Sequence, residues 1–475
     1  MSAEKLKYHF MKIYTILLFL LFNFVTQISL SNDFSSTPPD STSNIVDRAA
    51  AAYLIDEGRT FFNQGKVKNA LTKFREAAIK DPYSWKASFW VGKCHYRLGN
   101  FGYAVRYGNN AILLGGERVD NEVYFNVALA YHQMAKLDSA MINYDIAIAE
   151  MPKVRQKELN VSKRRQKCLF AAEVMKNQPT VNRESIKGYI NGGFDEYGVV
   201  LADNGNTIYF TSRRNNTTGG GMNPDDQLYF EDIYRATKNS DSEEWDDVTN
   251  NLGKLNSDGF EALNYLSPDG LWGIVTLNNT ATEEGRKATR GSDICEIKKN
   301  TKGVFNKPKV ISNKSINTSF FEGAATLTAD GNTMYFVSDR KGGKSSTDIY
   351  MVQKNGKVWG EAEPLPFHIN TLGRETTPFI SPDGRYLFFS SDGHEGMGEL
   401  DIYVVENKGG EWGTPVNLGY GINSVNNDTH FVYDEGSKRG YLTGSELIGN
   451  KSSLNIFEMD LKDFKIPQPP SKDQN

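Results

Sequence analysis

The second half of the chain repeats one sequence pattern five times. Each copy opens with an Ile-Asn or Leu-Asn pair and an acidic residue, then passes through an Asp-Gly or equivalent turn into an aromatic-rich run and an Asp-Ile-Tyr-like run. The copies are 52–65 residues apart, which leaves room for four short strands and their turns. Asp-Gly and Asn-Gly between apolar runs are strong hairpin signals. Five four-stranded sheets around one axis make a β-propeller, so residues 178–463 are predicted to form one. The opening pairs are Ile190-Asn191, Leu255-Asn256, Ile316-Asn317, Ile369-Asn370 and Ile422-Asn423.

The fifth copy is one strand short. The first four copies each end with a fourth strand, whereas the fifth ends after Ile456–Leu461. An unfilled last blade would expose a strand edge. The segment Thr180–Ile190, just before the first opening pair, has the character of an isolated fourth strand. We therefore expect this N-terminal strand to close the propeller by completing its C-terminal blade.

The five copies resemble the WD40-like, Asp-Gly-containing propeller repeats of TolB and related envelope proteins. Residues 381–393 are the cleanest copy, and the resemblance covers roughly residues 180–463. It implies the propeller fold and is weak for function. One acidic position recurs once per blade, which a catalytic residue has no reason to do, so we expect these side chains to cap backbone N–H groups at strand starts. They are Asp232, Asp293, Asp348 and Asp401.

Residues 46–177 have helical periodicity and a shorter repeat. Gly58, Gly92 and Ala128 are 34 and 36 residues apart, and an alanine follows each of them after twelve residues. This order, with aromatic residues four positions after the alanine in units one and three, resembles the tetratricopeptide repeat over residues 51–153. Unit two departs from the pattern, with Gly108 at the aromatic position and Gly116 in place of a proline. Its second helix is thus less certain, and Val154–Lys176 is expected to be a capping helix.

The resemblance to tetratricopeptide repeats also implies a partner-binding groove. In such arrays the first helix of each unit lines the concave surface, and residues at i, i+3 or i+4, and i+7 share a helix face. Cations between aromatic rings suit an extended acidic peptide with a bulky side chain, and Arg and aromatic residues dominate binding hot spots. The alternative is that these aromatic side chains pack into the neighbouring unit or the capping helix. The predicted partner-binding residues are Arg59, Phe62, Lys86, Phe89, Lys93, Tyr96, Arg97 and Phe125, with Ile55, Leu129 and His132 on the same faces.

The N-terminus reads as an export signal. Lys5 and Lys7 precede the apolar run Ile16–Val25, and small polar residues follow, so residues 1–31 are predicted to be a signal peptide. An uncleaved anchor is the alternative, although the run is short for a membrane span. Residues 32–45 are rich in Ser, Thr and Pro, and are expected to be a disordered linker. Residues 464–475 are expected to be a disordered tail.

The composition points away from nucleic acid and from catalysis. Basic and acidic residues are balanced, 54 against 58, so nothing favours a polyanionic partner. Three widely spaced cysteines and six scattered histidines show no metal-ligand spacing. Asn223–Asp226 and Asp392–Glu399 are acidic and glycine-rich enough to consider for calcium, but neither follows EF-hand spacing. We expect no catalytic residues, no metal site and no cofactor.

The combination of modules resembles envelope proteins of the Bacteroidota. In that family the two modules usually precede an OmpA-like, peptidoglycan-binding domain, and some members belong to the type IX secretion and gliding machinery. Because the chain ends at Asn475, such a domain is not expected here. The resemblance implies a non-enzymatic adaptor in the periplasm, associated with the outer membrane, that binds other envelope proteins or an extended peptide. The alternatives are a propeller that binds or acts on a glycan or peptide in its axial funnel, and a TolB-like accessory to a transport complex.

Overall fold

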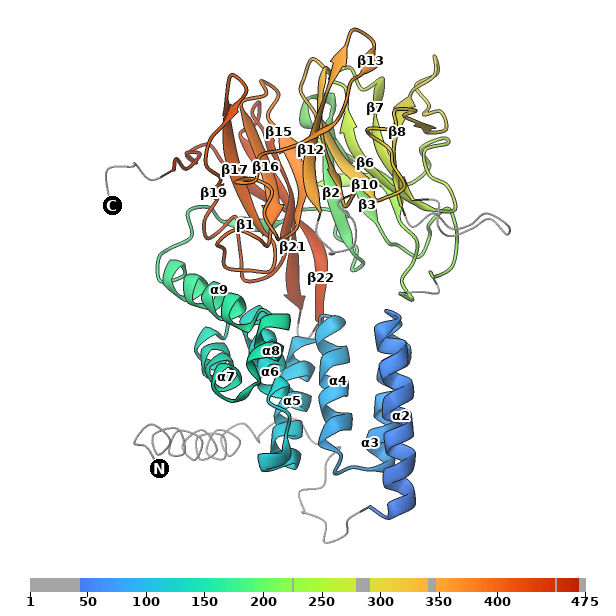
Figure 1. The fold of residues 1–475 in the computed structure, drawn as a ribbon. Helices are drawn as coiled ribbons and strands as arrows, with labels where there is room; N and C mark the ends of the chain where they lie inside the picture. The colour runs from blue at the N-terminus through green and yellow to red at the C-terminus, as the bar shows by residue number, and fades with distance from the viewer. Residues whose placement is uncertain (1–42, 224–225, 279–290, 341–346, 449–450, 470–475) are drawn as a thin grey trace. The chain divides into compact units, whose positions relative to one another are not determined.

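The computed structural model describes residues 43–223, 226–278, 291–340, 347–448 and 451–469 (Figure 1). From Ile45 onward the chain forms one compact unit. The predicted signal peptide and all but the end of the predicted linker lie outside the described residues, as does the end of the predicted tail.

Within the described residues eight α-helices come first, and the first six form three antiparallel pairs. They confirm the predicted helical array. Their bounds are α2 (Ile45–Asn63), α3 (Val67–Lys80), α4 (Trp85–Arg97), α5 (Phe101–Gly115), α6 (Glu122–Gln133), α7 (Leu137–Glu150), α8 (Lys153–Glu158) and α9 (Val161–Val174), with a 3-10 turn at Gly116–Arg118.

The repeating small residues lie where paired helices touch. A Cβ atom on Gly58 would lie 2.6 Å from the ring of Phe74, and one on Gly92 would lie 3.3 Å from the carbonyl oxygen of Ala104. Phe74 is completely buried in the same seam. Gly58 therefore leaves room for the Phe74 ring, and Gly92 lies in a tight contact with α5, as the repeat pattern indicates.

Unit two keeps its second helix, and the structure explains both of its departures from the pattern. Val127 of α6 packs directly on Gly108, and a Cβ atom on Gly108 would overlap its Cγ2. Gly116 has a φ of 53° and ends α5, so it takes the place of the expected proline. The single predicted capping helix is instead α8 and α9, because Asn160 between them is left-handed, with a φ of 51°.

The rest of the described chain forms five antiparallel sheets, which confirms the five-bladed propeller (Figure 1). The fourth strands are shorter than predicted, and in blades three and four each is split in two. The first four blades are β2 (Glu196–Ala202), β3 (Thr207–Ser212), β4 (Asp232–Lys238) and β5 (Trp245–Thr249); β6 (Phe260–Leu266), β7 (Trp272–Asn278), β8 (Asp293–Lys298) and β9 (Lys309–Val310); β10 (Glu322–Leu327), β11 (Thr333–Ser338), β12 (Asp348–Asn355), β13 (Val358–Trp359) and β14 (Glu363–Pro364); and β15 (Glu375–Ile380), β16 (Tyr386–Ser391), β17 (Asp401–Lys408), β18 (Glu411–Trp412) and β19 (Val416–Asn417).

Blade five contains both ends of the propeller segment. It consists of β20 (Asp428–Asp434), β21 (Arg439–Ile448) and β22 (Lys451–Asp460), with β1 (Arg183–Ser185) as its outer strand. In the antiparallel pair of β1 and β22, Arg183 lies opposite Met459 and Ser185 opposite Phe457. The predicted closure by an N-terminal strand is therefore confirmed.

The recurring Ile-Asn pair has a structural purpose at every blade junction. Asn256 accepts a hydrogen bond from the Ile233 N–H and donates one to the Ile233 carbonyl oxygen, both at 2.9 Å. The side-chain amide of Asn256 thus makes the two hydrogen bonds with Ile233 that a residue of a neighbouring strand would make. The preceding Leu255 is completely buried. The same two bonds join Asn317 to Ile294, Asn370 to Ile349, Asn423 to Ile402 and Asn191 to Ile456.

A carboxylate is buried at the start of every innermost strand. Three of the five lie near an arginine: Glu196 near Arg214, Glu322 near Arg340 and Asp428 near Arg183. Glu261 makes no ion pair with any described residue, and burial raises its pKa to about 7 against hydrogen bonds from Ser257. The five carboxylates, all with no exposed surface, are Glu196, Glu261, Glu322, Glu375 and Asp428.

Candidate peptide-binding surface of the helical array

Within the described residues, the propeller segments that contact the helical array include three hairpins, each joining the second and third strands of a blade, and Val425 before β20, whose carbonyl oxygen accepts from Gln133 at 3.1 Å. In blade one, Lys68 donates to the Gln227 carbonyl oxygen at 2.6 Å. In blade five, the Ser452 N–H donates to the Gly99 carbonyl oxygen at 2.9 Å. In blade four, residues 392–400 make the most extensive contact. The propeller face that carries these loops is therefore the face that meets the helices.

The blade-four loop, residues 392–400, lies along helices of the second half of the array. His132 donates from Nε2 to the Met397 carbonyl oxygen at 2.9 Å, because a carbonyl can only accept. Lys167 donates to the next two carbonyl oxygens, those of Gly398 at 2.9 Å and Glu399 at 3.0 Å. Three successive backbone carbonyls of the loop are therefore bound by side chains of the array.

The Glu399 carboxylate is the charged end of this contact. Arg164 lies 2.5 Å from its Oε2, and the Tyr96 hydroxyl lies 3.4 Å from its Oε1. Burial opposes the charge on Glu399, but Arg164 and then Lys167 outweigh it and hold its pKa below the ordinary value. Burial lowers the pKa of His132 to about 4. At neutral pH the contact therefore consists of a neutral His132 and a charged Arg164–Glu399 pair.

The first half of the array carries a second group, which we call the aromatic–cation cluster: Arg59, Phe62, Trp90, Lys93 and Arg97. The rings of Phe62 and Trp90 meet edge to face at 5.4 Å. Lys93 Nζ lies 4.6 Å from the Trp90 ring centre, Arg59 Cζ lies 5.8 Å from the same centre, and Arg97 Cζ lies 5.7 Å from that of Phe62. Such cation–π contacts hold cations at an aromatic surface.

The three cations of this cluster differ in how free they are. Lys93 lies 2.8 Å from Glu122, which is buried and also pairs with Arg155 at 2.7 Å. Burial opposes the Glu122 charge, yet these two cations hold its pKa below the ordinary value. Among the described residues, Arg59 pairs only with its exposed helix neighbour Asp56. Arg97 is exposed and forms no ion pair within the described chain. Arg59 and Arg97 are thus the cations available to a partner.

The structure brings four of the predicted partner-binding residues together: Arg59, Phe62, Lys93 and Arg97. Tyr96 points to the propeller instead, and its hydroxyl meets Glu399.

The remaining three predicted residues lie outside the cluster. Lys86 is exposed at the start of α4, over Trp85. Phe89 and Phe125 are only 7% and 5% exposed. Phe89 packs on Val123 and Val127 of the next unit. Phe125 packs on Tyr144 of its own unit, in a cluster that includes Val161 and Cys168 of α9. The alternative of packing into the neighbouring unit or the cap therefore describes these two rings.

Trp90, Arg164 and Lys167 are the important residues that sequence reasoning missed. Trp90, Lys93 and Arg97 have the i, i+3, i+7 spacing of one helix face, so the spacing alone could have identified Trp90. Arg164 and Lys167 lie in the segment expected to cap the array, where basic residues suggested contact with solvent. Their actual partners are more than 230 residues away, and no local pattern indicates them.

The recurring aspartates lie at the starts of the third strands. Asp232 accepts from the N–H and hydroxyl of Thr218 and from the Asn250 amide, each at 2.8 Å. Asp401 accepts from the N–H groups of Met397 and Gly398 at 3.0 and 3.1 Å. Burial raises the pKa of Asp401 to about 7, against Lys167 at 3.8 Å. Hydrogen bonds of this kind are what a loop cap requires.

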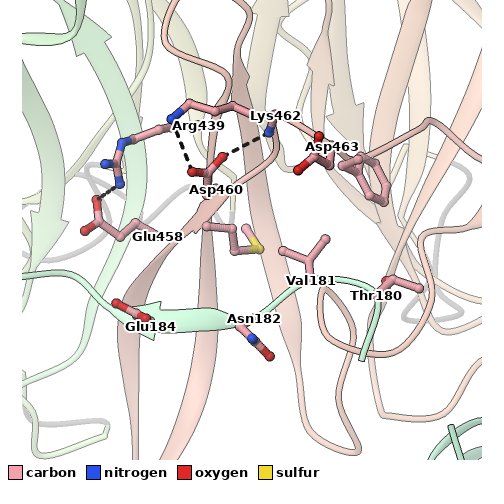
Figure 2. Close-up of a pocket in the computed structure, with 11 residues that line it drawn as sticks. Thr180, Val181, Asn182, Glu184, Arg439, Glu458, Asp460, Lys462 and Asp463 are labelled. Carbon is pink, nitrogen blue, oxygen red and sulfur yellow. Dashed lines mark hydrogen bonds and ion pairs between the residues drawn. The ribbon is translucent and has the colours of Figure 1, made fainter. Parts of the chain in front are cut away.

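Two other places in the propeller bear on ligand binding. Beside the axis, Tyr197 and His430 pack with ring centres 5.7 Å apart, and burial lowers the pKa of His430 to about 4. A pocket of about 450 Å³ lies beside the pairing of β1 and β22 (Figure 2). Its two cations, Arg439 and Lys462, already pair with the pocket's own Glu458 and Asp460. Neither place offers a free charge to an anionic ligand.

Metal binding and membrane spanning find no support within the described residues. They contain no group of three or more side chains placed to hold a metal ion. Of the two acidic loops considered for calcium, one includes residues 224–225, outside the described chain, and the other is the blade-four loop, whose Glu399 binds Arg164. Among the helices described, none has the length and apolar character to cross a bilayer.

No protein-family model matches this chain, and no curated protein matches it. The solved structures that match include tetratricopeptide-repeat domains and a type III secretion chaperone. The first such domain of Spaghetti (RPAP3), bound to an HSP90 peptide, is 22% identical and covers 27% of this chain and 98% of its own, with a TM-score of 0.25. The type III secretion translocator chaperone SycD of Yersinia enterocolitica is 19% identical and covers 28% of this chain and 100% of its own, also with a TM-score of 0.25. The likeness concerns the fold of the helical array alone.

Proposed function

We propose that this protein is a non-catalytic interaction scaffold whose helical array binds an extended acidic peptide at the aromatic–cation cluster. The observation that carries the proposal is the placement of Arg97. It is exposed, lies over Phe62 and makes no ion pair with any described residue. An exposed cation held by a ring is already positioned, so a carboxylate binds it at a reduced entropic cost.

The contact with the blade-four loop supports this mode of binding. Array side chains there bind three backbone carbonyls and one glutamate of a single bent loop. The same array thus has the chemistry to hold acidic peptides. Aromatic rings flanked by arginine are also the composition typical of binding hot spots.

We further propose that the protein acts in the bacterial cell envelope, as a periplasmic adaptor associated with the outer membrane and accessory to a secretion or gliding complex. The support is the basic and apolar N-terminal sequence, together with the resemblance of the two modules to envelope proteins. Fractionation of cells that produce the protein tests the location. Recovery in the cytosol with an intact N-terminus would contradict export.

The binding proposal is tested by reversing the free cations. The double variant Arg59→Glu/Arg97→Glu should lose capture of envelope partners from detergent-solubilised membranes, while its circular dichroism spectrum and Tm stay unchanged. Lys93 is unsuitable for this test, because a glutamate there would face the buried Glu122. Arg118→Glu is the matched control: it reverses one exposed cation outside the cluster and should capture partners normally. Undiminished capture by the double variant would exclude the cluster as the binding site.

A further inference from the structure

The blade-four loop is bound to the array in the manner of a peptide ligand. We infer that the second half of the array is a separate peptide-binding site and that the loop is its built-in occupant, which an acidic partner peptide of similar sequence displaces. The inference rests on the proposal that the array binds peptides, but it concerns different residues from the aromatic–cation cluster.

The array residues of this site contact both the backbone and the side chains of the loop. His132 and Lys167 bind three consecutive carbonyl oxygens of the bent loop, so these contacts do not depend on the side chains of the bound segment. Arg164 and Tyr96 bind the carboxylate of Glu399. Met397, two residues earlier, has no exposed surface and packs in one cluster with Ala171 of α9. The site therefore selects a methionine followed two residues later by a glutamate.

The loop is shaped for this position. A Cβ atom on Gly398 would overlap the carbonyl oxygen of Asn426, and one on Gly396 would overlap the Asp401 carboxylate. Glycine on both sides of Met397 thus lets the loop turn tightly at the propeller while its outer edge meets the array. The Asp401 carboxylate holds this turn by accepting from the N–H groups of Met397 and Gly398.

A tethered occupant competes strongly with any peptide in solution. An intramolecular segment has an effective concentration on the order of millimolar. A partner peptide with the same contacts must exceed this concentration or make additional contacts. While the blade-four loop is bound, the second half of the array is therefore not accessible to other peptides. A partner that displaces the loop also separates the array from blade four.

The test uses the full chain and a synthetic fluorescent peptide of residues 393–400 as the probe. Wild-type protein should bind it weakly, because the loop occupies the site. Glu399→Arg places a third cation beside Arg164 and Lys167 and should release the loop, so this variant should bind the probe at least about tenfold more tightly. A probe with glutamine in place of its Glu399 should bind the variant about tenfold more weakly than the original probe.

Two further variants make the result decisive. Arg164→Glu removes the receptor cation and should bind the probe no better than wild type. Arg164→Glu/Glu399→Arg restores an ion pair and should close the site again. If Glu399→Arg, with wild-type helical content and Tm, binds the probe no more tightly than wild type, the loop is only an interdomain contact. Because none of these variants alters the aromatic–cation cluster, this failure is distinct from failure of the Arg59→Glu/Arg97→Glu test.

Discussion

Asn191 holds both polar groups of the Ile456 backbone. Its side-chain oxygen accepts from the Ile456 N–H and its amide donates to the Ile456 carbonyl oxygen, each at 2.9 Å across 265 residues of sequence. The other four Ile-Asn and Leu-Asn pairs join consecutive blades, whereas this one joins the first and last parts of the propeller segment.

Asn191→Ala should lower the free energy of unfolding by about 1–3 kcal/mol, because it leaves the Ile456 N–H without its partner and removes one of the two hydrogen bonds that the Ile456 carbonyl oxygen accepts, the other coming from the Ile186 N–H. Urea unfolding followed by tryptophan fluorescence measures the loss. Asn182→Ala, at an exposed position nearby, should change stability by less than about 0.5 kcal/mol. Equal effects from the two substitutions would contradict a closing role for Asn191.

Glu261 should make the propeller less stable as pH rises. Its pKa is about 7 in the folded protein and 4.5 in an unfolded chain, so the folded state binds the extra proton between these values. The stabilisation is complete below pH 4.5 and is lost as pH rises through 7, with a total of about 3 kcal/mol for this shift. Glu261→Gln should therefore raise stability at pH 8, leave it nearly unchanged at pH 4.5, and reduce the pH dependence measured by urea unfolding.

Glu322→Gln is the matched control at the same position of blade three. Glu322 accepts from Ser338 at 2.8 Å and lies 3.5 Å from Arg340, so its neutralisation should destabilise the protein at pH 8. If both glutamine variants change stability in the same direction at pH 8, the absence of an arginine beside Glu261 does not explain its effect on stability.

Gly108 and Val127 should show strong coupling. Gly108→Ala overpacks the contact between α5 and α6, and Val127→Ala leaves space there. The double variant combines an added methyl group with the space to hold it. It should be more stable than the sum of the single effects by about 1–3 kcal/mol. A double-mutant cycle by thermal unfolding measures this coupling, and additive effects would mean that the two positions do not touch.

Asp232 should stabilise the propeller as a hydrogen-bond acceptor more than through its negative charge. All three of its donors meet Oδ2, while Oδ1 is buried without a hydrogen-bond partner among the described residues. Asp232→Ala should therefore cost about 1–3 kcal/mol. Asp232→Asn, which keeps one acceptor oxygen, should stay within about 1 kcal/mol of wild type. A loss in the asparagine variant as large as in the alanine variant would show that the charge is required.

The sequence predicted the two folds well because their determinants recur. Every blade repeats the same Asn-to-Ile hydrogen bonds, and every helical unit repeats a small residue against a ring, so a weak signal is present several times. The closing strand followed from counting: four copies have a fourth strand and one does not.

The candidate site was predicted only in part because its determinants do not recur. The choice between Phe89 and Trp90 depends on a rotation of α4 by about one residue, which a repeat alignment does not fix. His132, Arg164 and Lys167 contact residues 397–399. These contacts join a helical repeat to a propeller repeat, and neither repeat pattern carries information about the other. Tertiary packing alone brings them together.

The pairing of β1 with β22 also sets the order in which the chain can fold during synthesis. Arg183 leaves the ribosome about 275 residues before its partner Met459. At about 5–20 residues per second, this interval lasts roughly 14–55 s. During that time the first four blades are synthesised one after another, and until β22 emerges the edge of β1 lacks its partner strand. The nascent protein therefore has a long period in which strand edges are open to other chains, and the period ends only when the last blade emerges.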